Sequence, residues 1–471
     1  MSIGGGLRME LNKKIDEMKE ELIKSAQEVI KIKSTLDGEK PGMPFGEGVG
    51  KTLDKALEIA ADLGFNTYKE EEGYYGYAEY GKGDDYVAVL GHMDVVPEGD
   101  NWIHPPYAAE IHEGKIYGRG SLDDKGPTMA ALFGLKAIKE LKIPLSKKVR
   151  VIFGTNEETG SSEMKVYNKK EKVPVSGFTP DAMYPLINAE KGIRRFHIVK
   201  DLNPSEGKIK IKSLKGGIRP NMVPDKCSTV IGTKDPDGIV KAVKDFAGKK
   251  GYNMKTETAD GDVVLHTFGV GAHGSMPEMG KNAVMQTFEF LGTIIGGPSP
   301  LAEYINFFNK YVGFETEGTS LKIACEDKPS GKLSWNVGVA EINDKKADLW
   351  IDMRYPVTAD GEKIMDTVSM EFAKCGAKIE DVKADKPLYF PEDSKLVKIL
   401  LEVYKEQTGK EGKAYGIGGG TYAKELSNII GFGPIFPGKP DLDHQANEYI
   451  EIEDLIMNAK IYAHAIYELA K

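Results

Sequence analysis

Strand-like segments alternate with helix-like segments over the first 190 residues, and this alternation limits the possible folds more than any other feature of the chain. YVAVLG (86–91) is a continuous apolar run typical of a buried strand, and KVRVIFGTNEE (148–158) indicates another strand that ends in paired acids. Between them, residues 127–141 carry apolar side chains at helical spacing after an initial proline. YPLINAE (184–190) indicates a third strand. Such alternation predicts an α/β domain with a mixed, largely parallel sheet flanked by helices.

A different pattern occupies the middle of the chain. Two segments, 208–231 and 333–357, have the alternation of a strand hairpin, and each is followed by a helix-like segment, near 237–250 and 361–375. Because the same plan occurs twice, we expect an inserted α+β domain with two pseudo-repeated halves.

The first pattern then returns, and the domain boundaries follow from these changes. Residues 1–190 and 387–471 are expected to form one α/β domain, interrupted by an inserted domain over 191–386. The remaining elements expected in the first domain are helices over 10–33, 51–63 and 393–408, a strand near 433–436 and a last helix from about 451.

Charge and cysteine content narrow the class of protein. The 471 residues include 63 Lys and Arg against 72 Asp and Glu, and the net charge of -9 disfavours nucleic acid or an anionic membrane as a partner. The first residues, MSIGGGLRMELNKK, lack the apolar core of a secretion signal and are interpreted as a leader, so we expect a cytoplasmic location. Cys227, Cys325 and Cys375 lie far apart without a CxxC pair, so any metal site must use histidine and carboxylate ligands.

The first candidate site segment is LGHMDVVP (90–97), at the end of the first strand. A histidine there can ligate a metal ion, and Asp94 can accept the other ring proton of His92 and fix its tautomer. A structural hydrogen bond between His92 and Asp94 explains this segment equally well.

Acidic residues follow in YGRGSLDDKG (117–126), where tight glycine turns can bring Asp123 or Asp124 into a cleft. One carboxylate that bridges two divalent cations would offset part of their mutual repulsion. The alternative is that Asp123 or Asp124 caps the helix after it, and for this segment alone the cap is the commoner explanation.

Three more segments contribute candidates. In TNEETGS (155–161), one of the adjacent acids Glu157 and Glu158 can bind a metal while the other stays free as a general base. Asp181 lies in TPDAMYP, and His444 lies in PDLDHQANEYI (440–450). Taken singly, each of these residues is more often a solvated loop residue.

The combination is more informative than any one segment. Two histidines and three carboxylates occur in order at the ends of α/β units: His92, Asp123, Glu158, Asp181 and His444. Nitrogen and oxygen ligands without sulfur suit zinc, with manganese or cobalt as alternatives. Five protein ligands suffice for two ions that share one aspartate. Two ions about 3.5–4 Å apart can activate a water molecule and polarise a carbonyl group.

A family resemblance rests on five motifs in this order: LGHMDVVP, GRGSLDDKGP, TNEETGS, GAHGSMPEMGKNA and PDLDHQANE. Together they resemble the aminoacylase/carnosinase/ArgE/DapE family of metallopeptidases, and most of all its peptidase V branch of bacterial dipeptidases. The resemblance covers nearly the whole chain. It implies a zinc-binding catalytic domain interrupted by a lid domain.

The resemblance also implies roles for the metal-site residues. One zinc ion would be held by His92, Asp123 and Asp181, and the other by Asp123, Glu158 and His444, with Glu157 as general base. The family's bridging acid is the first aspartate of its D-x-K-G motif, which selects Asp123 and leaves Asp124 as the second choice. A cis peptide bond between Asp123 and Asp124 is implied as well.

Further roles are implied for the inserted domain and the C-terminal part. His273 matches the lid histidine that stabilises the tetrahedral oxyanion, although a histidine between two glycines is often only a turn residue. Asn221 and Arg354 resemble groups that grip the substrate, and the arginine fork suits a terminal carboxylate. Arg354 can instead serve an internal salt bridge. Gly418 and Gly419, in GIGGGTYA, resemble a loop that lines the substrate pocket.

The function expected from these residues is a two-zinc dipeptidase for short peptides with a free amino end, with Xaa-His and β-Ala-His among the open substrate choices. The large, duplicated lid points to a monomer with a small peptide as partner. An N-acyl amino acid deacylase or desuccinylase of the same family is the first alternative. A non-catalytic protein that binds metal, or nucleotide through GIGGGT, is the second, but the strand–GxGxxG–helix unit is missing.

Overall fold

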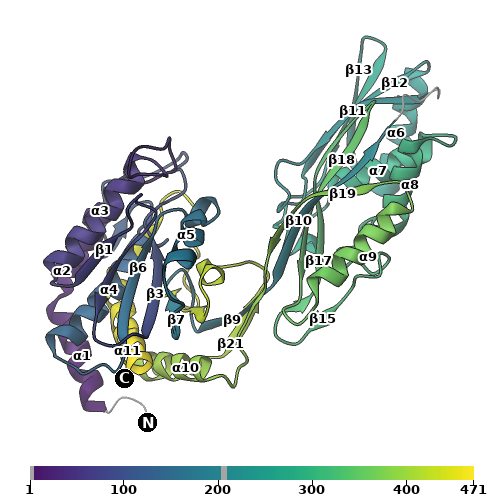
Figure 1. Cartoon of the computed structure of the whole chain (residues 1–471). Coiled ribbons are helices and arrows are strands. Elements are labelled where there is room, and N and C mark those ends of the chain that lie inside the picture. Colours follow the sequence, from purple (N-terminus) through teal and green to yellow (C-terminus); the bar gives the residue numbers. More distant parts are fainter. Residues whose placement is uncertain (1–4, 203–208) are drawn as a thin grey trace. The chain divides into compact units, whose positions relative to one another are not determined.

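The computed structural model describes residues 5–202 and 209–471, which form two compact units (Figure 1). Unit 1 comprises Met1–Asn188, Tyr389–Tyr415 and Gly420–Lys471. Unit 2 comprises Ala189–Leu388 and Gly416–Gly419. Residues 1–4 of the expected leader and residue 208 of the expected hairpin lie outside the described residues.

Unit 1 is built on a mixed nine-stranded sheet in which four neighbouring strands run parallel. These are, in spatial order, β6 (Lys148–Gly154), β3 (Tyr86–His92), β7 (Ser176–Thr179) and β22 (Ile429–Gly431). The outer strands are β1 (Asn66–Lys69) and β2 (Gly76–Tyr80) on one side, and β9 (Leu186–Glu190), β20 (Leu388–Tyr389) and β21 (Ala414–Ile417) on the other. The parallel strands are almost wholly buried, which explains their continuous apolar sequences.

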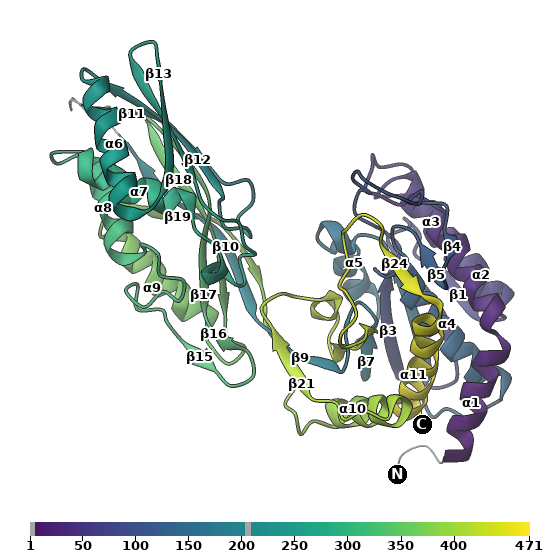
Figure 2. The same ribbon diagram turned by 180° about the vertical axis from the view of Figure 1, so that it is seen from behind.

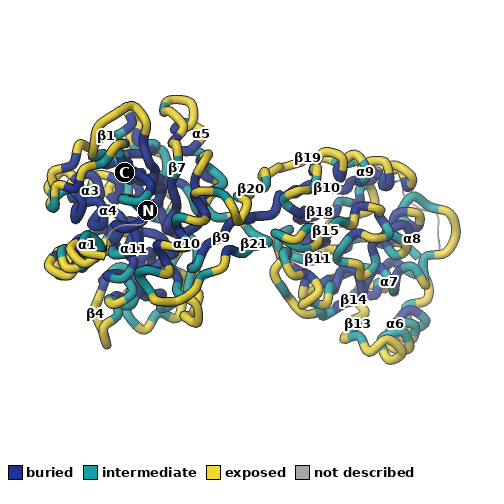
Figure 3. The backbone as a smooth tube through the Cα atoms, turned by 90° about the horizontal axis from the view of Figure 1, so that it is seen from below, coloured by how far each residue is buried: buried dark blue, intermediate teal, exposed yellow. Residues whose placement is uncertain are grey.

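Helices pack against this sheet or against one another and complete the α/β architecture. They are α1 (Gly5–Glu17), α2 (Lys19–Ile30), α3 (Glu47–Asp62), α4 (Lys125–Glu140), α5 (Ser162–Lys170), α10 (Lys395–Thr408) and α11 (Ile452–Ala470). The helices α4 and α11 contact each other and both contact β3, and most residues of these three elements are buried (Figure 3).

Two small sheets complete unit 1. One has three strands in the order β24 (Tyr449–Glu451), β5 (Lys115–Tyr117) and β4 (Glu110–His112). The other pairs β8 (Ala182–Met183) with β23 (Pro434–Ile435). Short 3-10 helices lie at Glu157–Thr159 and Tyr422–Glu425.

Unit 2 is an α+β unit with one eight-stranded antiparallel sheet. Its strands, in spatial order, are β13 (Asn253–Ala259), β14 (Asp262–Phe268), β12 (Lys226–Thr233), β11 (Ile209–Gly216), β17 (Ser334–Asn343), β18 (Lys346–Tyr355), β10 (Gly192–Asp201) and β19 (Lys378–Asp385). Its helices are α6 (Pro236–Lys250), α7 (Ala283–Ile294), α8 (Pro300–Tyr311) and α9 (Gly361–Ala373), gathered along one face of the sheet (Figure 2). A short pair, β15 (Glu326–Asp327) with β16 (Gly331–Lys332), and a 3-10 helix at Pro277–Met279 complete it.

The two halves of unit 2 repeat one plan, as the sequence predicts. The hairpin β11–β12 leads into α6 and then β13, and the hairpin β17–β18 leads into α9 and then β19. The first strands of the two hairpins, β11 and β17, pair with each other at the centre of the sheet. The strands that follow the two helices, β13 and β19, lie at the two edges of the sheet. Each is two positions from the hairpin strand before its helix, β12 or β18.

Several elements differ in detail from the sequence prediction. The helix predicted over 10–33 is two helices, α1 and α2, because the chain leaves helical geometry at Met18. The strand predicted to continue to 158 ends at Gly154. The third parallel strand is β7, whereas the segment predicted for that place, now β9, pairs antiparallel with β22. The strand predicted near 433–436 is β23, which pairs with β8 instead of the main sheet.

None of the helices in the described part of the chain is long and apolar enough to cross a membrane.

The contact between α4 and α11 depends on a glycine. A Cβ atom at Gly134 would lie 2.9 Å from the backbone nitrogen of Ala463 and 3.1 Å from the carbonyl oxygen of Ala459. We therefore expect Gly134→Ala to lower the free energy of unfolding by about 1–3 kcal/mol, because backbone atoms cannot yield as a flexible side chain can. Urea denaturation measures this.

The matched control is Gly6→Ala in α1, where a Cβ atom would meet nothing within 4 Å. There alanine should be neutral or slightly stabilising, since it is the better helix former. Equal stability of the Gly134→Ala variant and the native chain would contradict the close packing of α4 against α11.

Candidate metal centre

The candidate ligands come from neighbouring strands of the parallel sheet. His92 is the last residue of β3, Glu157 and Glu158 follow β6, and Asp181 follows β7. Because β3 lies between β6 and β7 and all three run parallel, their carboxyl ends share one edge of the sheet. This is the edge at which open α/β sheets bind ligands.

Asp123 lies between two histidines, and each of its oxygens faces one of them. Its Oδ1 is 2.9 Å from His92 Nε2, and its Oδ2 is 3.2 Å from His444 Nε2. His444 Nε2 is also 2.9 Å from Glu158 Oε2. Two groups of potential metal ligands result: His92, Asp123 and Asp181 in the first, and Asp123, Glu158 and His444 in the second, with the ligand atoms of each within 4.8 Å of one another.

Asp94 holds this arrangement in place through hydrogen bonds with three of its residues, His92, Glu157 and Glu158. His92 Nδ1 is 3.0 Å from the carbonyl oxygen of Asp94 and 3.5 Å from its carboxylate, so the backbone accepts the ring proton more directly than the side chain expected from the sequence. This hydrogen bond leaves the lone pair of Nε2 free for a metal. The Asp94 carboxylate accepts the backbone N–H groups of Glu157 and Glu158, each at 3.1 Å, and so fixes the turn that carries both acids.

Asp124 belongs to neither group of potential ligands. Its Oδ2 accepts the backbone N–H of His92 at 3.3 Å and the hydroxyl of Thr128 at 2.9 Å. It precedes the first residue of α4 but makes no side-chain cap to the helix backbone. The Asp123–Asp124 peptide bond is cis, which confirms the prediction from the family resemblance.

The pKa shifts of the cluster show that its carboxylates have too few positive groups beside them. Burial, together with the charge of Asp123, raises the pKa of Glu158 to about 7 and that of Asp181 to about 6. Burial and the charge of Asp181 raise the pKa of Glu157 well above its usual value. Hydrogen bonds to Asp123 and Glu158 raise the pKa of His444 to about 11. These shifts express an excess of carboxylates over neighbouring positive groups in a buried place.

The side chains fit a pair of divalent cations on chemical grounds. All ligand atoms are imidazole nitrogens or carboxylate oxygens, which suit zinc and related metals. Among residues 5–202 and 209–471, the buried Oε1 of Glu158 has no hydrogen-bond partner. A buried acceptor of this kind is costly unless a cation or water satisfies it.

Glu448 was not predicted from the sequence, although it stands in one of the motifs that carry the family resemblance. This fully buried carboxylate accepts the backbone N–H groups of Gly120, Leu122 and Asp123 at 3.0, 2.8 and 3.2 Å. It also pairs with Arg119 Nη1 at 2.6 Å. Glu448 therefore holds the loop that presents Asp123. The sequence feature that pointed to Glu448 was its place in the motif, four residues after His444, as an acid without an assigned role.

The candidate substrate residues of the inserted domain come together within unit 2. The backbone oxygen of Asn221 accepts the N–H of Gly274 at 2.7 Å, next to His273. His273 Nδ1 lies 2.6 Å from the Ser275 hydroxyl and 3.4 Å from the Ser275 N–H. When Nδ1 accepts from both groups, the ring proton is on Nε2. Burial and the nearby charge of Arg354 lower the pKa of His273, so its ring is neutral at pH 7.

Arg354 lies against the glycine-rich loop in the same unit. Its Nη1 donates to the carbonyl oxygen of Gly418 at 2.8 Å. A Cβ atom at Gly419 would lie 4.0 Å from the same nitrogen. Its Nε donates to Asp352 at 2.8 Å, so the internal salt bridge that the sequence left open as an alternative is present. A Cβ atom at Gly418 would lie 2.8 Å from Ser275 Cβ, which explains the need for glycine there.

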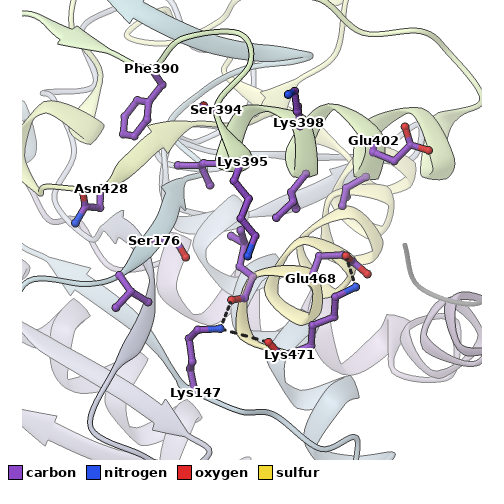
Figure 4. A pocket seen from close by; sticks show the side chains of 15 residues that line it. Lys147, Ser176, Phe390, Ser394, Lys395, Lys398, Glu402, Asn428, Glu468 and Lys471 are labelled. Carbon is purple, nitrogen blue, oxygen red and sulfur yellow. Dashed lines mark hydrogen bonds and ion pairs between the residues drawn. The ribbon is translucent and has the colours of Figure 1, made fainter. Parts of the chain in front are cut away.

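A cavity of about 680 Å³ lies in unit 1 (Figure 4), and none of the candidate metal ligands lines it. Lys147, Val175 and Ser176 line it at the amino ends of β6 and β7, the edge opposite the metal ligands. Its acidic lining residues are Glu402 and Glu468, and no histidine lines it. The cavity therefore has no part in the chemistry of the metal ligands.

Comparisons with known proteins identify a family for this chain. The family model of Peptidase family M20/M25/M40 matches residues 88–468. The chain is 42% identical over 460 residues to the candidate dipeptidase YtjP of Bacillus subtilis (strain 168), covering 96% of this chain and 98% of that protein.

Solved structures share the fold. Aminoacylhistidine dipeptidase from Vibrio alginolyticus has a TM-score of 0.59 at 12% identity, covering 96% of each chain. The Bacillus subtilis YXEP protein, described as a dinuclear metal binding peptidase, has a TM-score of 0.50 at 12% identity, covering 97% of this chain and 99% of that one. The chain therefore belongs to Peptidase family M20/M25/M40 and is a hydrolase with a divalent-metal centre.

Proposed function

We propose that the protein is a two-zinc dipeptidase that hydrolyses short peptides with free amino and carboxyl ends. The observation that carries this proposal is that Asp123 is shared by two groups of ligands at the carboxyl edge of the sheet. The similarity to YtjP, which is named as a candidate dipeptidase, supports the choice of substrate class. Manganese or cobalt could occupy the same nitrogen and oxygen ligands.

The assigned ligands are His92, Asp123 and Asp181 for one ion, and Asp123, Glu158 and His444 for the other. When bound, such a pair of cations supplies a water nucleophile at neutral pH and polarises the scissile carbonyl. Glu157 accepts a proton from the attacking water and passes it to the amine that leaves when the C–N bond breaks. Asp94 keeps Glu157 in position through the backbone N–H that it accepts.

The substrate contacts are assigned to unit 2. The N–H at His273 Nε2 donates to the negatively charged oxygen that forms when water attacks the scissile carbonyl group. Arg354, Asn221 and the loop at Gly418 and Gly419 bind the terminal carboxylate. A guanidinium whose Nε and Nη1 are already held by Asp352 and Gly418 is fixed in orientation, which reduces the entropy lost on binding.

The adjacent glutamates should respond differently to substitution. Glu157→Gln should keep two metal equivalents but reduce turnover by about 10²–10⁴-fold, because it removes the proton acceptor and no ligand. Glu158→Gln should lose one equivalent, because it removes a ligand of the second ion. Elemental analysis of the purified variants, with kinetics on one dipeptide, measures both effects.

These two variants control for each other, since they make the same change at adjacent positions. Near-native turnover by the Glu157→Gln variant would contradict its role as base. Loss of metal from both variants would show that the two acids share one role.

A panel of substrates tests the specificity and the role of Arg354. Free dipeptides should be cleaved efficiently, and C-amidated or N-acetylated dipeptides and longer peptides poorly. Arg354→Ala should raise KM for free dipeptides while changing the hydrolysis of amidated ones little, because it removes the partner of the terminal carboxylate. Steady-state kinetics on matched pairs of substrates measures this difference.

Arg195→Ala is the matched control, because Arg195 pairs with the same carboxylate, Asp352, at 2.9 Å. If Arg354 acted only through Asp352, both variants would show the same change. Efficient hydrolysis of N-acetylated amino acids would instead favour the alternative function, an N-acyl amino acid deacylase. Efficient hydrolysis of long peptides would rule out a dipeptidase.

We also propose that the chain acts as a monomer in the cytoplasm. The second half of unit 2 repeats the first, so one chain carries both halves of the lid plan. Cys227, Cys325 and Cys375 are unpaired, as is usual for cytoplasmic proteins.

If each chain supplies its own His273, mixing the His273→Ala and Glu157→Gln variants should leave activity at the sum of the two separate variants. A mixture of native and Glu157→Gln protein shows how much activity dilution alone removes. Recovery of activity on mixing the two variants would show instead that the histidine is supplied by a second chain.

A further inference from the structure

A third group of potential metal ligands lies on the small three-stranded sheet of unit 1. It consists of His104, Glu110 and His112, whose ligand atoms lie within 4.8 Å of one another. Glu110 and His112 are two residues apart on β4 and therefore project from the same side of the strand. His104 reaches them from the preceding loop. None of the three belongs to the two groups that share Asp123.

One carboxylate oxygen is the meeting point of this group. Glu110 Oε2 is 2.8 Å from His112 Nε2 and 3.6 Å from His104 Nδ1. Ligands about 2.0–2.2 Å from a tetrahedral zinc ion lie about 3.3 Å from each other. The two distances lie on either side of that value, and the two histidine nitrogens lie within 4.8 Å of each other, so side-chain rotation can bring all three atoms to one ion.

The two imidazole rings are positioned by neighbouring aromatic rings. They stack with centroids 4.0 Å apart and planes 18° apart. The ring of Tyr117, on β5, lies 4.4 Å from that of His104, and Tyr449, on β24, lies 5.3 Å from Tyr117. The stack therefore keeps the two histidines beside each other. Because the lone pairs of imidazole nitrogens lie in the ring planes, the rings must turn from this near-parallel arrangement to share one ion.

The exposure of the group leaves room for the remaining ligands. The side chains of His112 and Glu110 are 45% and 43% exposed, and that of His104 is 23% exposed. Water can therefore complete a tetrahedral shell on the outer side. Two imidazoles and one carboxylate favour zinc over magnesium or calcium, which prefer oxygen ligands.

From these contacts we propose that His104, Glu110 and His112 form a third zinc site with a structural role. The loop that carries His104 is tied to the loop of His444 through Asn447. The Asn447 side chain accepts the N–H of Ile103 at 2.6 Å and donates to the carbonyl oxygen of Asn101 at 3.2 Å. An ion at this site fastens the His104 loop to β4 and thereby steadies the support of the His444 loop.

The test is a zinc titration of the metal-free full-length protein by calorimetry, with native protein and three variants. His112→Gln and Glu110→Gln should each bind one equivalent fewer than native protein, with affinity at this site lowered by more than about 100-fold. Loss of a partner outside the coordination shell alone costs about 10–100-fold, so loss of a ligand should cost more. The last equivalent of zinc should raise the melting temperature of native protein, and this increase should be absent from both variants.

His197→Gln is the matched control. His197 is 22% exposed, close to the 23% of His104, and pairs with one acid, Asp348, at 3.0 Å. It belongs to no group of three potential ligands in residues 5–202 and 209–471. This variant should bind as many equivalents as native protein.

An equal number of equivalents in native protein and in both site variants would overturn the proposal. So would zinc uptake at the site only at millimolar concentration, which would leave the group as hydrogen-bonded surface residues. The comparison does not depend on the two-zinc proposal, because it measures a difference of one equivalent whatever the Asp123 centre binds. Turnover of the site variants at saturating zinc should stay within about twofold of native, since neither variant removes a ligand of that centre.

Discussion

The position of one buried carboxylate, Asp123, decides the rest of the site. Its two oxygens face His92 and His444, which come from strands and loops more than 300 residues apart in the sequence. A carboxylate buried between two imidazoles must be held firmly, because small movements would exchange one partner for the other. Glu448 supplies this constraint by accepting three backbone N–H groups of the loop that presents Asp123. The loop is thus fixed through its backbone, and the Asp123 side chain remains free for metal.

At the neighbouring strand ends, one residue, Asp94, likewise fixes several site residues through the backbone. The Asp94 carboxylate accepts the N–H groups of both Glu157 and Glu158, while its backbone carbonyl accepts the proton of the His92 ring. One residue therefore sets the tautomer of a proposed ligand and the directions of two acids. Substitution of Asp94 would disturb both strand ends at once. This coupling explains why the acids can stay so close together although burial and the charges of Asp181 and Asp123 raise their pKa values.

The sequence predicted much of this fold because its strongest signals are periodic. Buried strands such as β3 and helices such as α4 follow the apolar patterns, and the sequence predicted the two hairpin–helix plans of unit 2 as a repeat. The strand β7 was not predicted, because four residues, SGFT, give too short a pattern. The break between α1 and α2 was not predicted either, because the apolar spacing continues through Met18. The role of Glu448 could not be predicted, since it depends on which backbone groups the fold brings to it.

The small sheet of β4, β5 and β24 is more important than its size suggests. The strand β5 precedes Asp123 by six residues, and β24 follows His444 by five, so their pairing brings together the two loops that deliver these residues. The outer strand β4 carries Glu110 and His112, and Asn447 ties the His104 loop to the end of the His444 loop. His444 itself lies at a positive φ of 63° and is half-exposed, so its own packing holds it weakly. Its position must therefore come from its partners, and this sheet is the rigid element nearest to it along the chain. An ion bound on β4 would strengthen the same frame from its outer edge without contributing any atom to the chemistry.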